Sequence, residues 1–218
     1  MIQGAIFDMD GLMLDTERIS ARGWIEAGRV MGVPIDEPFL AKFRGTNAAY
    51  SRRLCKERFG EAFDYDRARA IRTAYLHEVI DRTGVPVKKG LRELLSWLNE
   101  QNIPCAVATS TRQELAEEYL EKANLLKWFS YRIFGNLVEK SKPDPEIFLR
   151  AAEGLHRKAS ECAVFEDSPN GIRAGIAAGS LVIAIPDITE IPEELRQQAD
   201  AVLPDLLAAR DFLKEYQV

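Results

Sequence analysis

The sequence predicts an α/β protein with a Rossmann-like open parallel sheet, into which an all-helical domain is inserted. Short apolar runs, typical of buried parallel strands, alternate along most of the chain with helical patterns. Residues 16–85 break this alternation, because they carry helical patterns and no strand-like run. The chain has 218 residues, of which 46% are hydrophobic and 29% charged, so it can bury a core without disulfides.

Five apolar runs are expected to form the strands. The first ends in acidic residues, as expected for a strand whose carboxyl end opens onto a site. The runs cover residues 4–7, 103–109, 131–134, 162–165 and 181–185. Apolar residues at spacings of three and four predict helices between them, over residues 91–98, 115–123, 145–152 and 169–178.

The insert is expected to hold helices over residues 17–31, 47–59 and 66–82, with glycines between them. The chain would cross between the two parts near residues 15–17 and 83–87. The predicted domains are therefore a core of residues 1–15 and 86–218 and a helical cap of residues 16–85.

Charge is distributed unevenly between these parts. The predicted cap carries 13 basic and 10 acidic residues, and the rest of the chain carries 16 and 24. A cleft between the two could hold an anion against the cap, while acids of the core bind a cation. Ordinary charge on helix surfaces would give the same count, so both interpretations stay open.

Several classes of protein are disfavoured by composition. A net charge of −5 gives no basic footprint for nucleic acid or an anionic membrane. No apolar run approaches the roughly 20 residues that cross a bilayer, and the first residues lack the basic region of a signal peptide. Cys55, Cys105 and Cys162 form no Cys-x-x-Cys pair, which argues against disulfides and zinc. We expect a cytoplasmic protein without nucleic-acid or membrane partners; the sequence carries no signal of oligomeric state.

Two carboxylates, Asp8 and Asp10, follow the first strand, and Gly11 allows the chain to turn there. Asp8 can then serve as a nucleophile or a metal ligand, and Asp10 as an acid or base. A plain turn or a calcium loop would use similar residues. The calcium alternative lacks the downstream oxygen ligands of an EF-hand loop, because Met13 and Ile19 stand at ligand positions.

A hydroxyl cluster, Thr109-Ser110-Thr111, follows the strand at residues 103–109. If it opens the next helix, the amide groups and the dipole of that helix could bind a phosphate. A helix N-cap would be satisfied equally well by Ser or Thr at this place.

Lys142 precedes a helix and is followed by Pro143 and Pro145. The two prolines make a rigid turn, which can hold the lysine at a fixed point over the edge of the sheet. An ordinary surface lysine is the alternative.

Two further acids, Glu166 and Asp167, stand where a buried strand ends. Ionised acids in such a place cost free energy unless they are paired or bound to a cation. Sites with few carboxylates and retained water suit Mg²⁺, so Glu166 and Asp167, with Asp8 nearby, are expected to bind this cation. Capping of the next helix by Asp167 or Ser168 is the competing explanation.

All four groups follow strands, so they are expected at the carboxyl edge of one parallel sheet. A carboxylate nucleophile, a second carboxylate, a divalent cation and a lysine match phosphoryl transfer through an aspartyl-phosphate. Mg²⁺ and Lys142 would neutralise the charge that keeps Asp8 from a phosphoryl group. Asp10 would protonate the leaving group and then activate water.

In these four motifs the sequence resembles the haloacid dehalogenase superfamily, in its subgroup with a helical cap, which includes β-phosphoglucomutases and sugar-phosphate phosphatases. The motifs are residues 7–17, 107–110, 142–145 and 166–171. The resemblance implies Asp8 as nucleophile and Asp10 as acid/base that also offers its main-chain carbonyl to the metal. It implies Thr109 and Lys142 as holders of the phosphoryl group, with Ser110 beside the substrate, and Asp167 on Mg²⁺. Glu166 resembles an acid that joins the metal shell in some members.

The cap distinguishes phosphatases from mutases in this subgroup. β-Phosphoglucomutases carry a histidine and an arginine where this chain has Ser20 and Ala48. Their absence favours hydrolysis of a small phosphorylated metabolite, with a sugar phosphate as first choice. The loop at residues 44–47 is similar in place to the family's specificity loop, so Gly45 and Thr46 are candidate substrate contacts.

Other classes stay as alternatives or are excluded by motif. A mutase remains the main alternative, and a non-catalytic binding protein on the same fold is less favoured because both Asp8 and Asp10 are kept. A cysteine phosphatase needs Cys-x5-Arg, which none of the three cysteines begins.

Overall fold

The computed structural model describes residues 2–42 and 48–216. Within them, six parallel strands form one sheet in the order β3-β2-β1-β4-β5-β6. The strands are β1 (Gly4–Phe7), β2 (Cys105–Thr109), β3 (Tyr131–Phe134), β4 (Cys162–Glu166), β5 (Leu181–Ala184) and β6 (Ala201–Val202). The strand order reverses direction at β1, as in doubly wound α/β proteins, and the predicted fold class is confirmed.

Five α-helices of the described residues follow one another between β1 and β2, and helices alternate with the strands after that. The α-helices are α1 (Thr16–Met31), α2 (Glu37–Leu40), α3 (Ala48–Phe59), α4 (Tyr65–Thr83), α5 (Leu91–Glu100), α6 (Gln113–Lys122), α7 (Glu146–Gly154), α8 (Pro169–Ala177), α9 (Glu193–Gln198) and α10 (Leu206–Tyr216). Two short 3₁₀ turns are η1 (Leu126–Trp128) and η2 (Ala159–Glu161). None of the helices in the described residues combines the length and the apolar composition of a membrane span.

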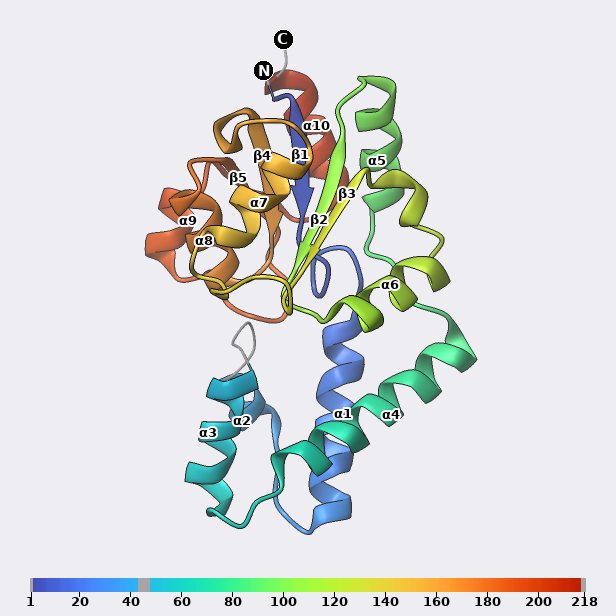
Figure 1. Cartoon of the computed structure of the whole chain (residues 1–218), viewed down its shortest axis with the longest axis vertical. Coiled ribbons are helices and arrows are strands. Elements are labelled where there is room, and N and C mark those ends of the chain that lie inside the picture. The colour runs from blue at the N-terminus through green and yellow to red at the C-terminus, as the bar shows by residue number, and fades with distance from the viewer. Residues whose placement is uncertain (1, 43–47, 217–218) are drawn as a thin grey trace.

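The sheet lies between two layers of helices (Figure 1). Successive side chains of a strand point to opposite faces, so each strand packs against both layers. Phe7 of β1 joins the cluster that α5, α6 and α10 complete. Its neighbour Ile6 joins the other face, with Phe148 of α7 and Ala174 of α8. Since β1 is buried on both faces, it reads as a continuous apolar run rather than an alternating one.

The helices α1 to α4 lie beyond the carboxyl ends of the strands (Figure 1). They have an apolar cluster of their own, which includes Trp24, Phe39 and Tyr65. The two connections to the rest of the chain run side by side, because the Asp15 amide donates to the Pro86 carbonyl at 2.9 Å. This layout matches the order of elements that the sequence predicts, while the domain limits at residues 15/16 and 85/86 stay a prediction.

Three details of the sequence prediction differ from the structure. The second strand begins at Cys105 rather than at residue 103, because Pro104 precedes it and has no amide hydrogen to donate to a ladder. The helix after it begins at Gln113, so the hydroxyl cluster at residues 109–111 does not form its first turn. The two-residue strand Ala201–Val202 was not predicted, since it is too short to show a pattern.

Gly90 lies close to the backbone at the start of α10, and this close packing can be tested. It has a φ of 85°, and a Cβ built there would lie 2.2 Å from the backbone nitrogen of Leu207, just after α10 begins. Gly90→Ala should therefore lower the free energy of unfolding by about 2–5 kcal/mol, the sum of a left-handed backbone and overpacking. Gly60 is the matched control, because its φ is 93° and a Cβ there meets nothing within 4 Å. Urea unfolding should show about 1–2 kcal/mol for Gly60→Ala, and equal losses would contradict the packing argument.

Candidate active site

The carboxyl ends of β1, β2 and β4 bring distant segments together. Phe7 pairs with Val107 of β2 on one side and with Phe165 of β4 on the other. Asp8 therefore lies at the same level of the sheet as Ala108 and Glu166. The predicted convergence of acids and hydroxyls at one sheet edge is seen in the structure for Asp8, Asp10, Thr109, Lys142, Glu166 and Asp167.

Lys142 lies at the centre of this group. Its Nζ donates to Asp8 Oδ1 at 2.5 Å, to Glu166 Oε1 at 2.6 Å and to the Ala108 carbonyl at 3.1 Å. These contacts use all three hydrogens of the ammonium group, which also lies 4.8 Å from the centre of the Phe148 ring. Burial alone would lower the pKa of Lys142, but the attraction of the two carboxylates outweighs it and raises the pKa. The lysine is therefore a fixed, buried cation, not a surface residue.

Glu166 is fully buried, and its carboxylate is saturated by hydrogen bonds. Oε1 accepts from Lys142, while Oε2 accepts from the amides of Asp167 and Ser168 and from the Ser168 hydroxyl at 2.9–3.0 Å. A Cβ on Gly171 would lie 1.8 Å from this carboxyl group, so only glycine fits there. The predicted metal role of Glu166 stays a prediction, and the contacts give it another one: it positions Lys142 and the turn after β4.

Asp8 and Asp167 hold more negative charge than one lysine can balance. Burial, opposed by Lys142 and reinforced by the nearby Glu166, raises the pKa of Asp8 to about 8. Burial and the charges of Glu166 and Asp8 also raise the pKa of Asp167 well above its usual range. Such an excess of buried carboxylate is stabilised by a cation.

The donors at this edge fit a hard, partly hydrated cation. In the part of the chain that the structure describes, no three His, Cys, Asp or Glu side chains form a ready-made metal cage. Mg²⁺ does not need one, because it keeps several waters and binds through one or two carboxylates and a substrate phosphate. The chemistry of Asp8 and Asp167 therefore suits Mg²⁺ better than Ca²⁺.

Asp10 is oriented by two hydroxyl groups. Thr16 Oγ1 donates to one carboxylate oxygen at 2.5 Å and Thr111 Oγ1 to the other at 2.6 Å. The turn that aims Asp10 depends on Gly11, whose φ is 88° and whose Cβ would lie 2.2 Å from Asp167. Sequence reasoning missed the roles of Thr16 and Thr111, although both belong to polar segments that it singled out.

Thr109 ends β2 and is buried, and its Oγ1 accepts a hydrogen bond from the Thr111 amide at 3.0 Å. This bond makes residues 109–111 a turn rather than the start of a helix. None of the three hydroxyls caps α6, whose Gln113 amide donates instead to Asn136. The expectation that the cluster opens the helix is therefore wrong, while Thr109 does lie at the predicted edge.

Of the two residues expected as possible caps of the helix after β4, Asp167 and Ser168, it is Ser168 that caps it. Its side chain accepts from the Gly171 amide at 3.1 Å, which is the N-cap bond of α8. The cap role falls to Ser168, so the Asp167 carboxylate is left for another purpose. Ser110 is exposed beside the cluster, and the predicted contacts Gly45 and Thr46 lie outside the described residues.

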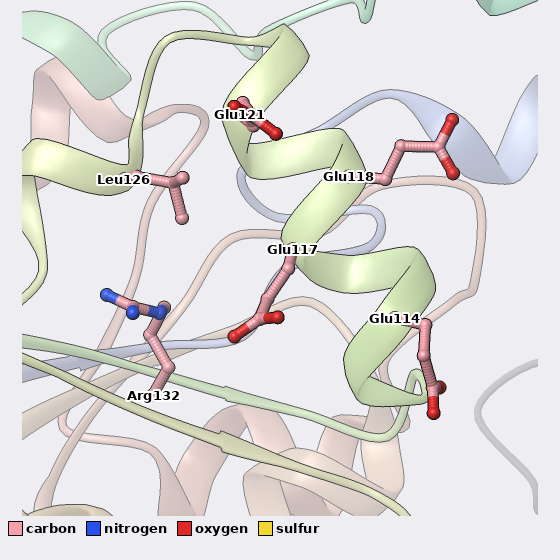
Figure 2. A pocket seen from close by; sticks show the side chains of 6 residues that line it. All are labelled: Glu114, Glu117, Glu118, Glu121, Leu126 and Arg132. Atoms are coloured by element: carbon pink, nitrogen blue, oxygen red, sulfur yellow. The ribbon is translucent and has the colours of Figure 1, made fainter.

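A cavity of about 450 Å³ lies elsewhere, over α6, and Figure 2 shows its lining. Its lining residues are Glu114, Glu117, Glu118, Glu121, Leu126 and Arg132. Four glutamates would repel a phosphate, so this cavity is unsuited to a phosphorylated ligand.

Comparison with known proteins agrees with this geometry. Residues 2–179 match the family model described as haloacid dehalogenase-like hydrolase. The chain is 32% identical over 186 residues to a phosphorylated carbohydrates phosphatase of Thermotoga maritima, covering 82% of each chain. It is 31% identical over 207 residues to hexitol phosphatase A of Escherichia coli, covering 94% of this chain and 91% of that one. A crystal structure of β-phosphoglucomutase from Clostridium difficile has the same fold, with a TM-score of 0.83, 23% identity and coverage of 99% and 96%.

The raised pKa of Asp8 predicts how stability depends on pH. Folded Asp8 keeps its proton up to about pH 8, whereas the unfolded chain releases it near 3.8. The folded state thus binds more protons between these values, and the stability of the metal-free protein should fall as pH rises from 4 to 8. Asp8→Asn should flatten this slope in urea unfolding with EDTA at pH 5, 6, 7 and 8.

Asp211→Asn is the control, because its side chain is 56% exposed. A slope that is equal in the wild type, Asp8→Asn and Asp211→Asn would contradict the assignment. Mg²⁺ should raise Tm more at pH 8 than at pH 5, since its carboxylate ligands must lose their protons to bind.

Proposed function

We propose, on the basis that the chain belongs to the haloacid dehalogenase-like hydrolase family, that it is a Mg²⁺-dependent phosphatase that cleaves a small sugar phosphate through an aspartyl-phosphate. One observation carries the proposal. Asp8 lies 2.5 Å from the ammonium group of Lys142, in a buried site with more carboxylates than that lysine can neutralise. A nucleophile of this kind needs a cation before it can approach a phosphoryl group.

Asp8 is the proposed nucleophile. An Asp8 oxygen forms a bond to phosphorus while the bond from phosphorus to the leaving oxygen breaks, and Asp10 gives its proton to that oxygen. Asp10 then takes a proton from the water that attacks phosphorus, and the bond from Asp8 to phosphorus breaks. The products are the free alcohol and inorganic phosphate, with Asp8 restored as a carboxylate and Asp10 as a protonated acid.

Lys142 and Thr109 would bind the phosphoryl oxygens. Lys142 is held in place by Glu166 and the Ala108 carbonyl, so only the hydrogen that it donates to Asp8 would have to turn to a phosphoryl oxygen when substrate binds. Asp8, Asp167 and the main-chain carbonyl of Asp10 would hold Mg²⁺. When bound, Mg²⁺ supplies positive charge that offsets the repulsion between Asp8 and the phosphoryl group.

A small sugar phosphate is the proposed substrate class, in line with the phosphorylated carbohydrates and hexitol named for the relatives. We propose that residues 16–85 form a cap over the site, which would exclude water as it closes. Ser110, Gly45 and Thr46 are the proposed contacts to the leaving group.

A phosphomutase is the second candidate, because a β-phosphoglucomutase shares the fold. Ser20 and Ala48 argue against it, since neither can act as the base or the cation that mutases are expected to carry there. Incubation with β-glucose 1-phosphate and its bisphosphate activator would distinguish the two activities. A phosphatase should give inorganic phosphate and glucose, whereas a mutase would accumulate glucose 6-phosphate.

Asp8→Asn should abolish turnover without unfolding the protein, because an amide of the same shape cannot attack phosphorus. Phosphate release from a panel of sugar phosphates, with and without Mg²⁺, measures the effect. Circular dichroism checks the fold, and mass spectrometry after rapid quenching should detect a phosphoryl group on the wild-type peptide that contains Asp8. Retained turnover in Asp8→Asn would refute the nucleophile.

Asp10→Asn should lower kcat by about 10²–10⁴-fold, the usual contribution of general acid–base catalysis. The variant should still bind Mg²⁺, because its proposed ligand at this position is the main-chain carbonyl. The loss should shrink for substrates with acidic leaving groups such as p-nitrophenol, which need no proton. An equal loss for alkyl and p-nitrophenyl phosphates would contradict the acid role.

A further inference from the structure

Four charged side chains meet where the helical segment joins the rest of the chain. Lys88 Nζ lies 2.6 Å from Asp187 Oδ1 and 3.3 Å from Asp15 Oδ1. Arg18 contacts the same two carboxylates, at 3.0 Å to Asp187 and 3.2 Å to Asp15. Asp15 belongs to the first connection, Lys88 follows the second, Arg18 is in α1, and Asp187 is in the loop after β5. We call these four residues the linker network.

Asp187 is the buried member of the linker network. Its side chain is 6% exposed, and its second oxygen, Oδ2, has no hydrogen-bond partner in the described residues. A carboxylate in such surroundings depends on the cations next to it, in contrast to an exposed pair, which contributes little. Lys89 and Asp205 form such an exposed pair directly beside the network, with the Lys89 side chain 74% exposed.

The linker network also holds the start of α1, where no side chain makes a capping hydrogen bond. Asp15 is the N-cap residue of α1, but its side chain makes no capping hydrogen bond. Its carboxylate faces Lys88 and Arg18 instead, so ion pairs fix the start of α1. The next residue, Thr16, donates the 2.5 Å hydrogen bond to Asp10.

We propose that Asp187 is a positioning residue for Asp10. Through Lys88 and Arg18 it ties both connections to the loop after β5, and this fixes the first turn of α1 and the Thr16 hydroxyl that orients Asp10. The inference rests on the proposed function, in which Asp10 is the acid and base of the reaction. Asp187 itself touches no reacting atom.

The test compares two neighbouring lysines. Lys88→Met and Lys89→Met remove the same charge one residue apart, but only the first breaks the linker network. We expect kcat for sugar phosphate hydrolysis to fall about 10–100-fold in Lys88→Met with KM changed less than threefold, because small displacements of a catalytic group cost this much. Lys89→Met should keep wild-type kcat, and Lys88→Arg should recover most of the loss. Equal kcat in Lys88→Met and Lys89→Met would overturn the proposal.

A double variant separates positioning from general destabilisation. If Asp187 acts through Thr16, the loss in kcat caused by Lys88→Met or Asp187→Asn should be much smaller on a Thr16→Val background. Full multiplication of the two losses would overturn the proposal. Should Asp187→Asn fail to fold, Lys88→Met carries the same comparison.

Hydrogen exchange gives a readout that needs no activity. The Asp15 amide, bonded to the Pro86 carbonyl, should exchange at least tenfold faster in Lys88→Met than in Lys89→Met. If the wild type released no phosphate from any substrate, the proposed function would fail while this comparison still decided whether the network fixes the connections. Unchanged exchange at Asp15 would overturn the network's role.

Discussion

The contact of Lys142 with Asp8 and Glu166 is the interaction on which the site depends. One ammonium group donates to the carboxylate of Asp8, which follows β1, and to that of Glu166 at the end of β4, and its third hydrogen reaches a carbonyl of β2. Three strands that are distant in sequence are therefore joined through one buried charge. Removal of Lys142 would leave two buried carboxylates unpaired, which costs about 3–5 kcal/mol. Loss of activity in a Lys142 variant would thus mix folding with chemistry, and Asp8 is the cleaner place to test the reaction.

The same contact supports the proposal that a cation binds at this site. Glu166 accepts four hydrogen bonds within the protein, one of them from Lys142. Because its negative charge balances part of the positive charge of Lys142, the charges of Asp8 and Asp167 are not fully neutralised. The raised pKa values of both follow from burial together with this shortage of positive charge. A site built in this way stores electrostatic free energy in the absence of metal and substrate. In the proposed function, binding of Mg²⁺ and substrate would release it, which would link stability to catalysis through the same two carboxylates.

The sequence allowed the fold and the meeting of the candidate residues at one sheet edge to be predicted, because both follow from local patterns. Apolar runs that end in Asp8, Thr109 and Glu166 need only the rule that parallel strands end at one edge. What escaped prediction depends on long-range side-chain geometry. Neither the saturation of Glu166 nor the hold of Thr16 and Thr111 on Asp10 has a spacing that marks it. The start of α6 was misplaced for the same reason, since the turn at residues 109–111 is set by a hydrogen bond between Thr109 and Thr111.

Residues 8–18 combine two tasks that many enzymes assign to separate segments. Asp8 and Asp10 are the proposed catalytic carboxylates, while Asp15 and Arg18 begin the connection to the helices beyond the sheet edge. Only five residues separate Asp10 from Thr16, and a hydrogen bond joins them. A movement of α1 that keeps this hydrogen bond would therefore carry the Asp10 side chain with it. The position of α1 and the orientation of the Asp10 side chain are therefore coupled. A cap that closes over the substrate would also orient Asp10 for proton transfer.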